Sequence, residues 1–145
     1  MISVKGIDNV PLMLARCCNP IYGDPIVGYI TRGRGISIHR VNCQNLAQLK
    51  KDSERILEAE WIKSDLIRAY VVNISTTVEN KPGVLAKLSS VISEEGVNIQ
   101  MAKATPVDTQ RSRVMFAIEV TSIKELQDLI SRLERVPEVK KVVRH

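Results

Sequence analysis

The second half of this chain, residues 67–145, alternates between the hydrophobic periods of strands and helices, and this alternation constrains the fold most strongly. One helix is expected to begin near Pro82 and to end at Gly96, and a second opens at the capping box Ser122-Ile-Lys-Glu125. Strands are expected over residues 68–78, 97–105, 113–121 and 139–143. The order β-α-β-β-α-β predicts a ferredoxin-like split βαβ fold.

The first half, residues 1–66, is predicted to form a smaller sheet with one helix. Leu46 and Leu49 lie on one side of a helix expected over residues 44–50. Arg32-Gly33-Arg34-Gly35 predicts a hairpin loop between two strands. Strands are expected over residues 10–15, 26–31, 36–40 and 56–62. The sequence thus predicts an α+β protein with two domains, 1–66 and 67–145.

Composition excludes several classes of protein. At 44% hydrophobic and 26% charged residues, the chain is typical of a globular protein and not of a disordered one. No apolar run approaches the ~20 residues that span a bilayer, and the first residues lack a secretion signal. We therefore expect a cytoplasmic protein with no membrane partner. The net charge of +5 permits a nucleic-acid partner without requiring one.

Four residues of types that bind metals occur between positions 17 and 43: Cys17, Cys18, His39 and Cys43. Zinc binds about four thiolate or imidazole ligands in a tetrahedron, and His39 with Cys43 fits one closely spaced pair. Cys17 and Cys18 fit poorly, because adjacent side chains in a strand point to opposite faces. Two interpretations stay open, a zinc site or cysteines that pack as small core residues. We favour packing and expect metal binding to be weak or optional.

Arg32 and Arg34 lie on the predicted hairpin, and Arg16 and Arg40 occur in the same stretch of sequence. Glycine lets a backbone approach a phosphate closely, and guanidinium groups bind phosphate with two hydrogen bonds. The hairpin lacks the later Gly or Lys of a dinucleotide or phosphate loop. Binding to a nucleic-acid backbone is the functional interpretation, and a solvated hairpin tip is the structural one.

The turn Asn80-Lys-Pro-Gly83 leads into a predicted helix, whose free N–H groups suit a carboxylate such as that of an amino acid. An ordinary strand-to-helix turn is the simpler alternative. No group of residues suits catalysis, because the only histidines are His39 and His145 and no nucleophile elbow or paired-carboxylate site occurs. We therefore expect that this chain is not itself an enzyme.

The sequence resembles the C-terminal regulatory region of the RelA/SpoT family, the bifunctional (p)ppGpp synthetase–hydrolases of the bacterial stringent response. In the first half the resemblance rests on Cys17-Cys18-Asn-Pro, on Gly28-Tyr-Ile-Thr-Arg-Gly-Arg-Gly-Ile-Ser-Ile-His39-Arg and on Asn42-Cys43. In the second half, Asn80-Lys-Pro-Gly-Val-Leu-Ala and Gly96-Val-Asn-Ile are similar to an ACT domain. The resemblance implies a zinc-finger-like, conserved-cysteine or ribosome-intersubunit domain over residues 1–66 and an ACT domain over residues 67–145.

The resemblance also implies a function. The chain would be a non-catalytic regulatory module of a GTP pyrophosphokinase or (p)ppGpp hydrolase, without the family's catalytic domains. It would bind the ribosome at 23S rRNA near the A site, beside an uncharged tRNA, and restrain the upstream catalytic domains of the same protein. The expected RNA-binding residues are Arg16, Arg32, Arg34, His39 and Arg40. The expected cysteine/histidine cluster, with zinc as its cofactor, is Cys17, Cys18, His39 and Cys43.

ACT domains often pair side by side and bind amino acids at the interface between them. The resemblance therefore implies a homodimer and, as an alternative function, an amino-acid-sensing dimerisation module. The ligand positions implied in this chain are Asn80, Gly83, Val84 and Asn98.

Overall fold

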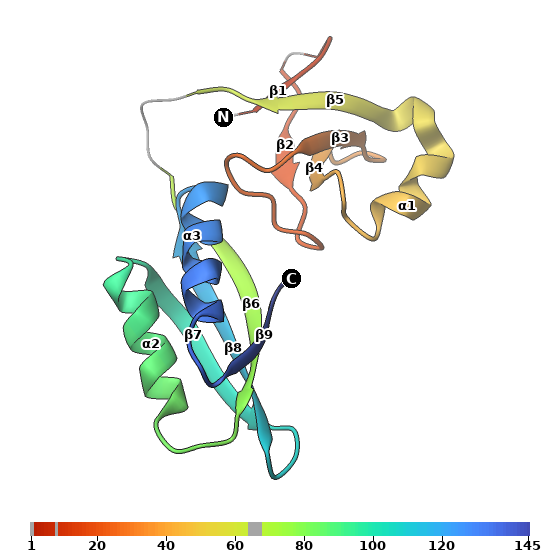
Figure 1. Ribbon diagram of the computed structural model, residues 1–145. Coiled ribbons are helices and arrows are strands. Elements are labelled where there is room, and N and C mark those ends of the chain that lie inside the picture. The colour runs from red at the N-terminus through yellow and green to blue at the C-terminus, as the bar shows by residue number, and fades with distance from the viewer. Residues whose placement is uncertain (1, 8, 64–67) are drawn as a thin grey trace. The chain divides into compact units, whose positions relative to one another are not determined.

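The computed structural model describes residues 2–7, 9–63 and 68–145 (Figure 1). The chain divides into two compact units, Met1–Ile67 and Arg68–His145, and each is described by itself. Among the described residues, none of the helices combines the length and the apolar character that crossing a membrane requires.

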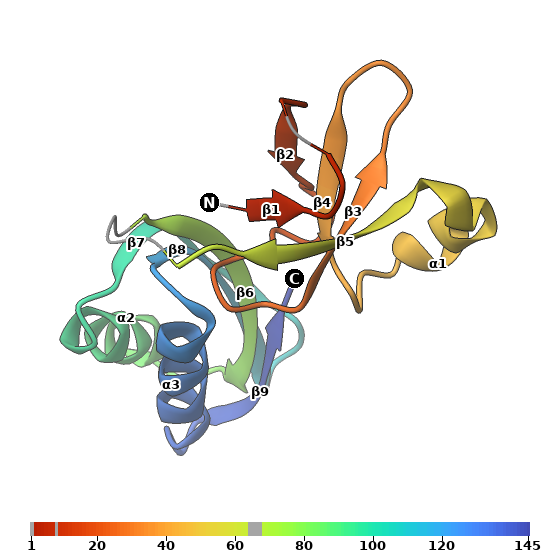
Figure 2. The ribbon, with the colours of Figure 1, turned by 90° about the horizontal axis from the view of Figure 1, so that it is seen from above.

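The first unit contains a five-stranded sheet with the strand order β1-β5-β3-β4-β2 (Figure 2). The parallel pair is β2 with β4, and the other neighbours are antiparallel. A short helix α1 (Leu46–Leu49) and a 3₁₀ helix η1 (Lys50–Arg55) connect β4 to β5. The strands are β1 (Ile2–Val4), β2 (Leu12–Leu14), β3 (Ile26–Ile30), β4 (Ile36–Arg40) and β5 (Ile56–Trp61).

The four predicted strands and the helix of this unit are confirmed. The helix and β2 are each three residues shorter than predicted, and β3 and β5 are each one residue shorter. β1 was not predicted, because its three residues are too few to show a hydrophobic period. It pairs with the far end of β5, where Ile2 lies opposite Trp61.

Strand β4 is buried on both faces, and this arrangement positions the candidate site. Ile36 and Ile38 point into an apolar cluster that also contains Val4 and Ile26. Because side chains alternate along a strand, Ser37 and His39 point to the opposite face. On that face His39 Nδ1 lies 3.9 Å from Cys18 Sγ, a member of a second buried group formed by Cys18, Cys43 and Leu46.

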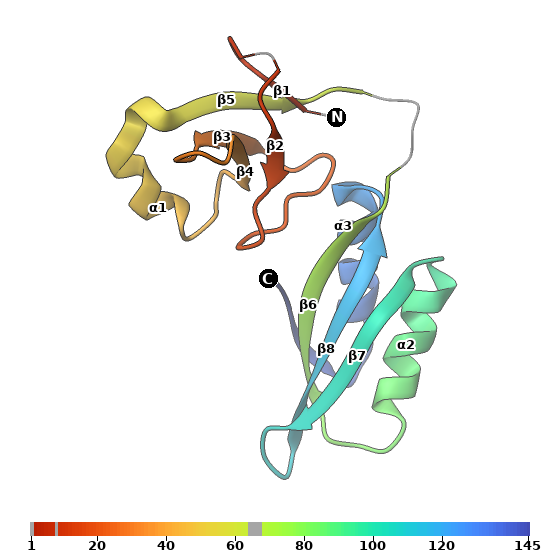
Figure 3. The same ribbon diagram turned by 180° about the vertical axis from the view of Figure 1, so that it is seen from behind.

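The second unit is a four-stranded antiparallel sheet with the order β7-β8-β6-β9, and both helices lie on one of its faces (Figure 3). This topology confirms the α+β class and the ferredoxin-like βαββαβ order. The elements are β6 (Tyr70–Glu79), α2 (Val84–Glu94), β7 (Asn98–Pro106), β8 (Arg111–Val120), α3 (Ile123–Glu134) and β9 (Val139–Arg144).

The predicted helix ends of the second unit are largely confirmed. The Ser122 side chain accepts a hydrogen bond from the Glu125 backbone N–H, as expected of a capping box. Gly96 has φ 74°, the left-handed conformation expected after a helix. One boundary differs, because Gly83 caps α2 with φ 83° and leaves Pro82 in the preceding turn.

Candidate functional site

Cys17 and Cys18 lie in a turn after β2 and not in a strand. The Asn19 backbone N–H donates to the Ala15 carbonyl oxygen at 3.0 Å, which closes a single helical turn. Asn19 has φ 44°, a left-handed conformation that ends this turn. Consecutive side chains in a helical turn are separated by about 100°, compared with about 180° in a strand. Both cysteine side chains can therefore point to one side of the backbone.

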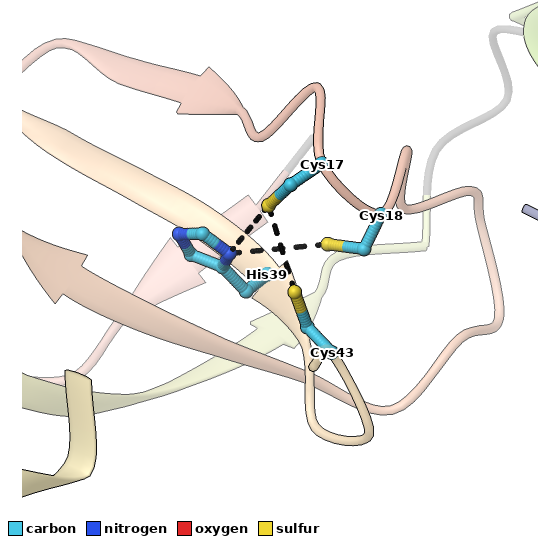
Figure 4. A group of neighbouring side chains, drawn as sticks. All are labelled: Cys17, Cys18, His39 and Cys43. Carbon is cyan, nitrogen blue, oxygen red and sulfur yellow. Dashed lines mark hydrogen bonds between the residues drawn. The ribbon is translucent and has the colours of Figure 1, made fainter. Parts of the chain in front are cut away.

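The ligand atoms of Cys17, Cys18, His39 and Cys43 all lie within 4.8 Å of one another (Figure 4). The Cys17 Sγ atom is 3.4 Å from His39 Nδ1 and 3.5 Å from Cys43 Sγ, and Cys18 Sγ is 3.9 Å from the same Nδ1. Three separate segments supply them: the turn after β2, the strand β4, and the turn after β4. The expectation that adjacent cysteines would not converge is wrong, because they lie in a turn.

The geometry of this Cys/His cluster fits a zinc ion. Zinc bonds of about 2.0–2.3 Å place the atoms of a tetrahedral ligand set roughly 3.5–3.8 Å apart. Three of the separations, 3.4, 3.5 and 3.9 Å, lie close to this range, and all four atoms lie within 4.8 Å of one another. Three sulfur atoms and one imidazole nitrogen are also the ligand types of structural zinc sites. The four residues are therefore a candidate metal centre.

Burial sets the protonation of the cluster. It raises the pKa of the Cys18 thiol to about 12, and it also raises the pKa of Cys17. Burial raises the pKa of Cys43 as well, but hydrogen bonds with Cys17 and with backbone groups outweigh it and leave this pKa below its ordinary value. Burial lowers the pKa of His39, which favours the neutral imidazole that binds metals. A cation that binds here must displace protons from thiols.

His39 is enclosed by the protein. Only 6% of it is exposed, its Nδ1 atom faces the sulfur atoms, and its Nε2 atom is 3.0 Å from Ser37 Oγ. His39 thus presents little surface to a partner, and its expected contact with RNA stays a prediction. Sequence analysis did not identify Ser37, although its position two residues before His39 on a strand was a usable signal.

The four predicted RNA-binding arginines do not form one surface. Arg32 and Arg34 are exposed on the β3–β4 hairpin, which extends beyond one end of both strands in Figure 2. Arg16 and Arg40 lie beside the Cys/His cluster at the other end of β4. The five residues of β4 separate the two pairs by about 17 Å along the strand. The hairpin and the cluster are thus distinct sites, and the arginines are neighbours in sequence only.

The predicted amino-acid site of the second unit is not assembled within one chain. Asn80 follows β6 at the end of the sheet where Glu79 pairs with Arg111. Asn98 begins β7 at the opposite end, where it pairs with Glu119. Because β8 is ten residues long, these ends are roughly 30 Å apart. Asn80 can act with Gly83 and Val84, but Asn98 of the same chain cannot join them.

A charged hollow of about 520 Å³ lies beside Asn80 and was not predicted. The carboxylate of Glu79 lies 2.8 Å from Lys81 Nζ and 3.2 Å from Lys140 Nζ, and the hydrogen bond with Lys81 lowers the pKa of Glu79. This carboxylate partly neutralises the cations around it. The lining residues are Glu79, Asn80, Lys81, Gln110, Arg111 and Lys140.

Two family models match this chain, one over each half. Residues 2–62 match the family model of the RelA/SpoT RIS domain, and residues 67–144 match that of the ACT domain. The GTP pyrophosphokinase of Myxococcus xanthus is 35% identical over 144 residues, which is 99% of this chain and 18% of that protein. The GTP pyrophosphokinase of Escherichia coli K12 is 34% identical over 140 residues, which is 95% of this chain and 19% of that protein.

Among solved structures, the crystal structure of the ACT domain from the GTP pyrophosphokinase of Chlorobium tepidum has a TM-score of 0.48 and 24% sequence identity. That alignment covers 54% of this chain and 100% of the other. The present chain spans less than a fifth of the length of the two curated relatives named above.

Proposed function

Because the chain belongs to the RelA/SpoT family and carries its RIS and ACT domains, we propose that it is a regulatory module of a (p)ppGpp synthetase–hydrolase. In this proposal residues 1–66 bind ribosomal RNA near the A site, beside an uncharged tRNA. Residues 67–145 self-associate or transmit the bound state to the catalytic domains of the same protein. The observation that carries the proposal is the exposed arginine hairpin.

The hairpin presents Arg32 and Arg34 on a fixed backbone. The Thr31 hydroxyl donates to the Gly35 carbonyl oxygen at 2.6 Å and accepts from the Arg34 backbone N–H at 3.1 Å. Both arginine side chains are exposed, and within the part of the chain that the structure describes neither forms an ion pair. Two unpaired guanidinium groups on a rigid loop suit a polyanionic backbone.

Replacing both residues, Arg32→Glu with Arg34→Glu, is expected to weaken binding to ribosomes in a pelleting assay. Each lost phosphate contact reduces the slope of log affinity against log salt by about 0.9, so a decrease of about 1.8 is expected. The control is Lys124→Glu with Arg135→Glu, which changes the net charge equally at exposed positions of the second unit. Equal affinity and equal slope in the hairpin variant and the wild type would refute an RNA-binding role for the hairpin.

We further propose that the Cys/His cluster holds a structural zinc ion. Its support is the convergence of three sulfur atoms and one imidazole nitrogen within 4.8 Å. When bound, the ion would supply no reaction and would connect the turn after β2 to the strand β4 and to the turn that follows β4. This proposal replaces our preference for a packing role, which rested on the assumption that Cys17 and Cys18 diverge.

Self-association through the ACT domain, with amino-acid sensing, is a second candidate function. Strand β7 is a sheet edge nine residues long, and every residue in it except Ile99 is exposed. Unpaired edges are templates for pairing with another chain. A two-fold antiparallel pairing of two β7 strands would bring the start of one strand, at Asn98, to the end of the other. In that arrangement two copies would complete the site that one chain leaves incomplete.

Replacing Ala102→Glu with Ala104→Glu is expected to make the protein monomeric in sedimentation analysis. Both alanines are exposed on β7, and a symmetric pairing sets the new carboxylates of the two copies close together. The matched control is Gln127→Glu with Ser131→Glu, which adds the same charge at exposed positions of α3.

Amino-acid binding is tested by calorimetric titration with each of the twenty amino acids. Heat of binding is expected for the wild type and not for the monomeric variant. A wild type that is monomeric and silent in these titrations would exclude this function.

A further inference from the structure

Ser37 and His39 point to the same face of β4, because they are two residues apart on a strand. The Ser37 Oγ atom lies 3.0 Å from His39 Nε2. The same Ser37 Oγ atom lies 3.5 Å from the carbonyl oxygen of Tyr29, its cross-strand partner, to which the hydroxyl can donate. Only 9% of Ser37 is exposed, so water does not replace these contacts easily. The imidazole is thus contacted on one side by a hydroxyl and on the other by sulfur atoms.

The direction of these hydrogen bonds decides which ring nitrogen has a free lone pair. A serine hydroxyl has one hydrogen, and it can be directed at the Tyr29 carbonyl oxygen, 3.5 Å away, or at His39 Nε2, 3.0 Å away. When it is directed at Tyr29, the oxygen is left to accept a hydrogen bond, and the single proton of the neutral imidazole lies on Nε2. In that tautomer the lone pair lies on Nδ1, the atom that is 3.4 Å from Cys17 Sγ and 3.9 Å from Cys18 Sγ.

The opposite tautomer would place the proton on Nδ1, between the ring and the sulfur atoms. It would also require the Ser37 hydroxyl to turn away from Tyr29 and donate to Nε2. A cation held by Nδ1 excludes this arrangement, since that nitrogen cannot keep its proton and bind a metal. The Nε2–H group of a metal-bound His39 then needs an acceptor, and Ser37 Oγ lies at hydrogen-bond distance.

We propose that Ser37 is the positioning residue of the metal centre, because it accepts the Nε2–H hydrogen bond and holds His39 in the tautomer that offers Nδ1. This inference rests on the zinc centre proposed above and assigns a role to a residue outside the ligand set. Hydrogen bonds to the second nitrogen of a metal-binding histidine orient the ring and increase its basicity. Removing such a partner lowers metal affinity about 10- to 100-fold.

The first test reads the tautomer directly in the wild-type protein. Long-range ¹H–¹⁵N correlation spectra of the His39 ring, recorded above neutral pH, are expected to show a protonated Nε2 in both the metal-free and the zinc-loaded forms. Zinc is expected to shift the Nδ1 resonance. A proton on Nδ1 in the metal-free protein, or coordination through Nε2 in the loaded one, would overturn the role of Ser37.

The second test measures zinc affinity by competition with a chromophoric chelator. Ser37→Ala is expected to weaken zinc binding about 10- to 100-fold, whereas Ser37→Thr, which keeps the hydroxyl, should restore most of the affinity. Ser3→Ala, at an exposed position of the same sheet, is the control. Equal affinity of Ser37→Ala and wild type would refute the inference while leaving the zinc centre intact.

The two proposals fail in different ways. A wild type that binds no zinc would refute the metal centre, and the spectrum of the metal-free protein would still decide whether Ser37 sets the tautomer. The same spectrum decides the question if Ser37→Ala does not fold.

Discussion

Replacing Cys43 by serine is expected to abolish zinc binding and to unfold the first unit while the second stays folded. The sulfur atom of Cys43 lies 3.5 Å from that of Cys17, and no other cysteine is available to replace it. Structural zinc contributes about 10–16 kcal/mol in zinc-finger peptides, which is comparable to the whole stability of a small domain at about 5–15 kcal/mol. Elemental analysis of protein purified without chelator should give one zinc per wild-type chain and none in the variant. In thermal unfolding, the variant should no longer show the transition of the first unit.

Removing zinc from the wild type with a chelator should reproduce the effect of Cys43→Ser. The control is Asn42→Ser, a substitution at the exposed neighbouring position, which should leave zinc content and unfolding unchanged. Because burial raises the pKa of Cys18 to about 12, zinc must displace protons, and its affinity should fall as the pH falls. A metal-free wild type whose unfolding matches that of the variant would restore the interpretation of the cysteines as packing residues.

The second unit could be predicted from the sequence because its signals are local. Leu126, Leu129 and Leu133 show the spacing of one helical face, and the structure buries all three. The capping box at Ser122 and the glycine at position 96 each determine a helix end only a few residues away in the sequence. Strand alternation is equally local, as in β6, where every second residue is buried. Such features require no knowledge of how distant segments pack.

The candidate sites were predicted less well, because they depend on turn conformations and topology. The residue types of the Cys/His cluster were identified, but the convergence of Cys17 and Cys18 depends on the helical turn that ends at Asn19. Arg34 and Arg40 are close in sequence, yet a complete strand separates them. Asn98 follows α2 closely in sequence, yet a βαβ crossover places it at the other end of the sheet from Asn80. Sequence distance was thus a poor guide to spatial distance in both units.

The substitution Gly35→Ala is expected to destabilise the first unit strongly and to weaken ribosome binding with it. Gly35 has φ 85°, and a Cβ atom there would overlap the carbonyl oxygen of Pro11 and lie 3.2 Å from its carbonyl carbon. The same oxygen accepts a hydrogen bond from the Ile36 N–H at 2.9 Å, so the clash falls where the hairpin joins the start of β2. Relief of the clash requires β2 and β4 to separate, and we expect a loss of at least ~3 kcal/mol in the free energy of unfolding.

Gly33→Ala is the matched control for this prediction, because it separates backbone strain from steric overlap. Gly33 has φ 87°, nearly the same conformation, but a Cβ atom there meets nothing within 4 Å. Its substitution should therefore cost only the left-handed strain of about 1–2 kcal/mol. Urea unfolding of both variants measures the difference, and equal losses would show that contact with Pro11 does not hold the hairpin. If the arginines act from a fixed loop, ribosome affinity should fall more in Gly35→Ala than in Gly33→Ala, although both variants keep Arg32 and Arg34.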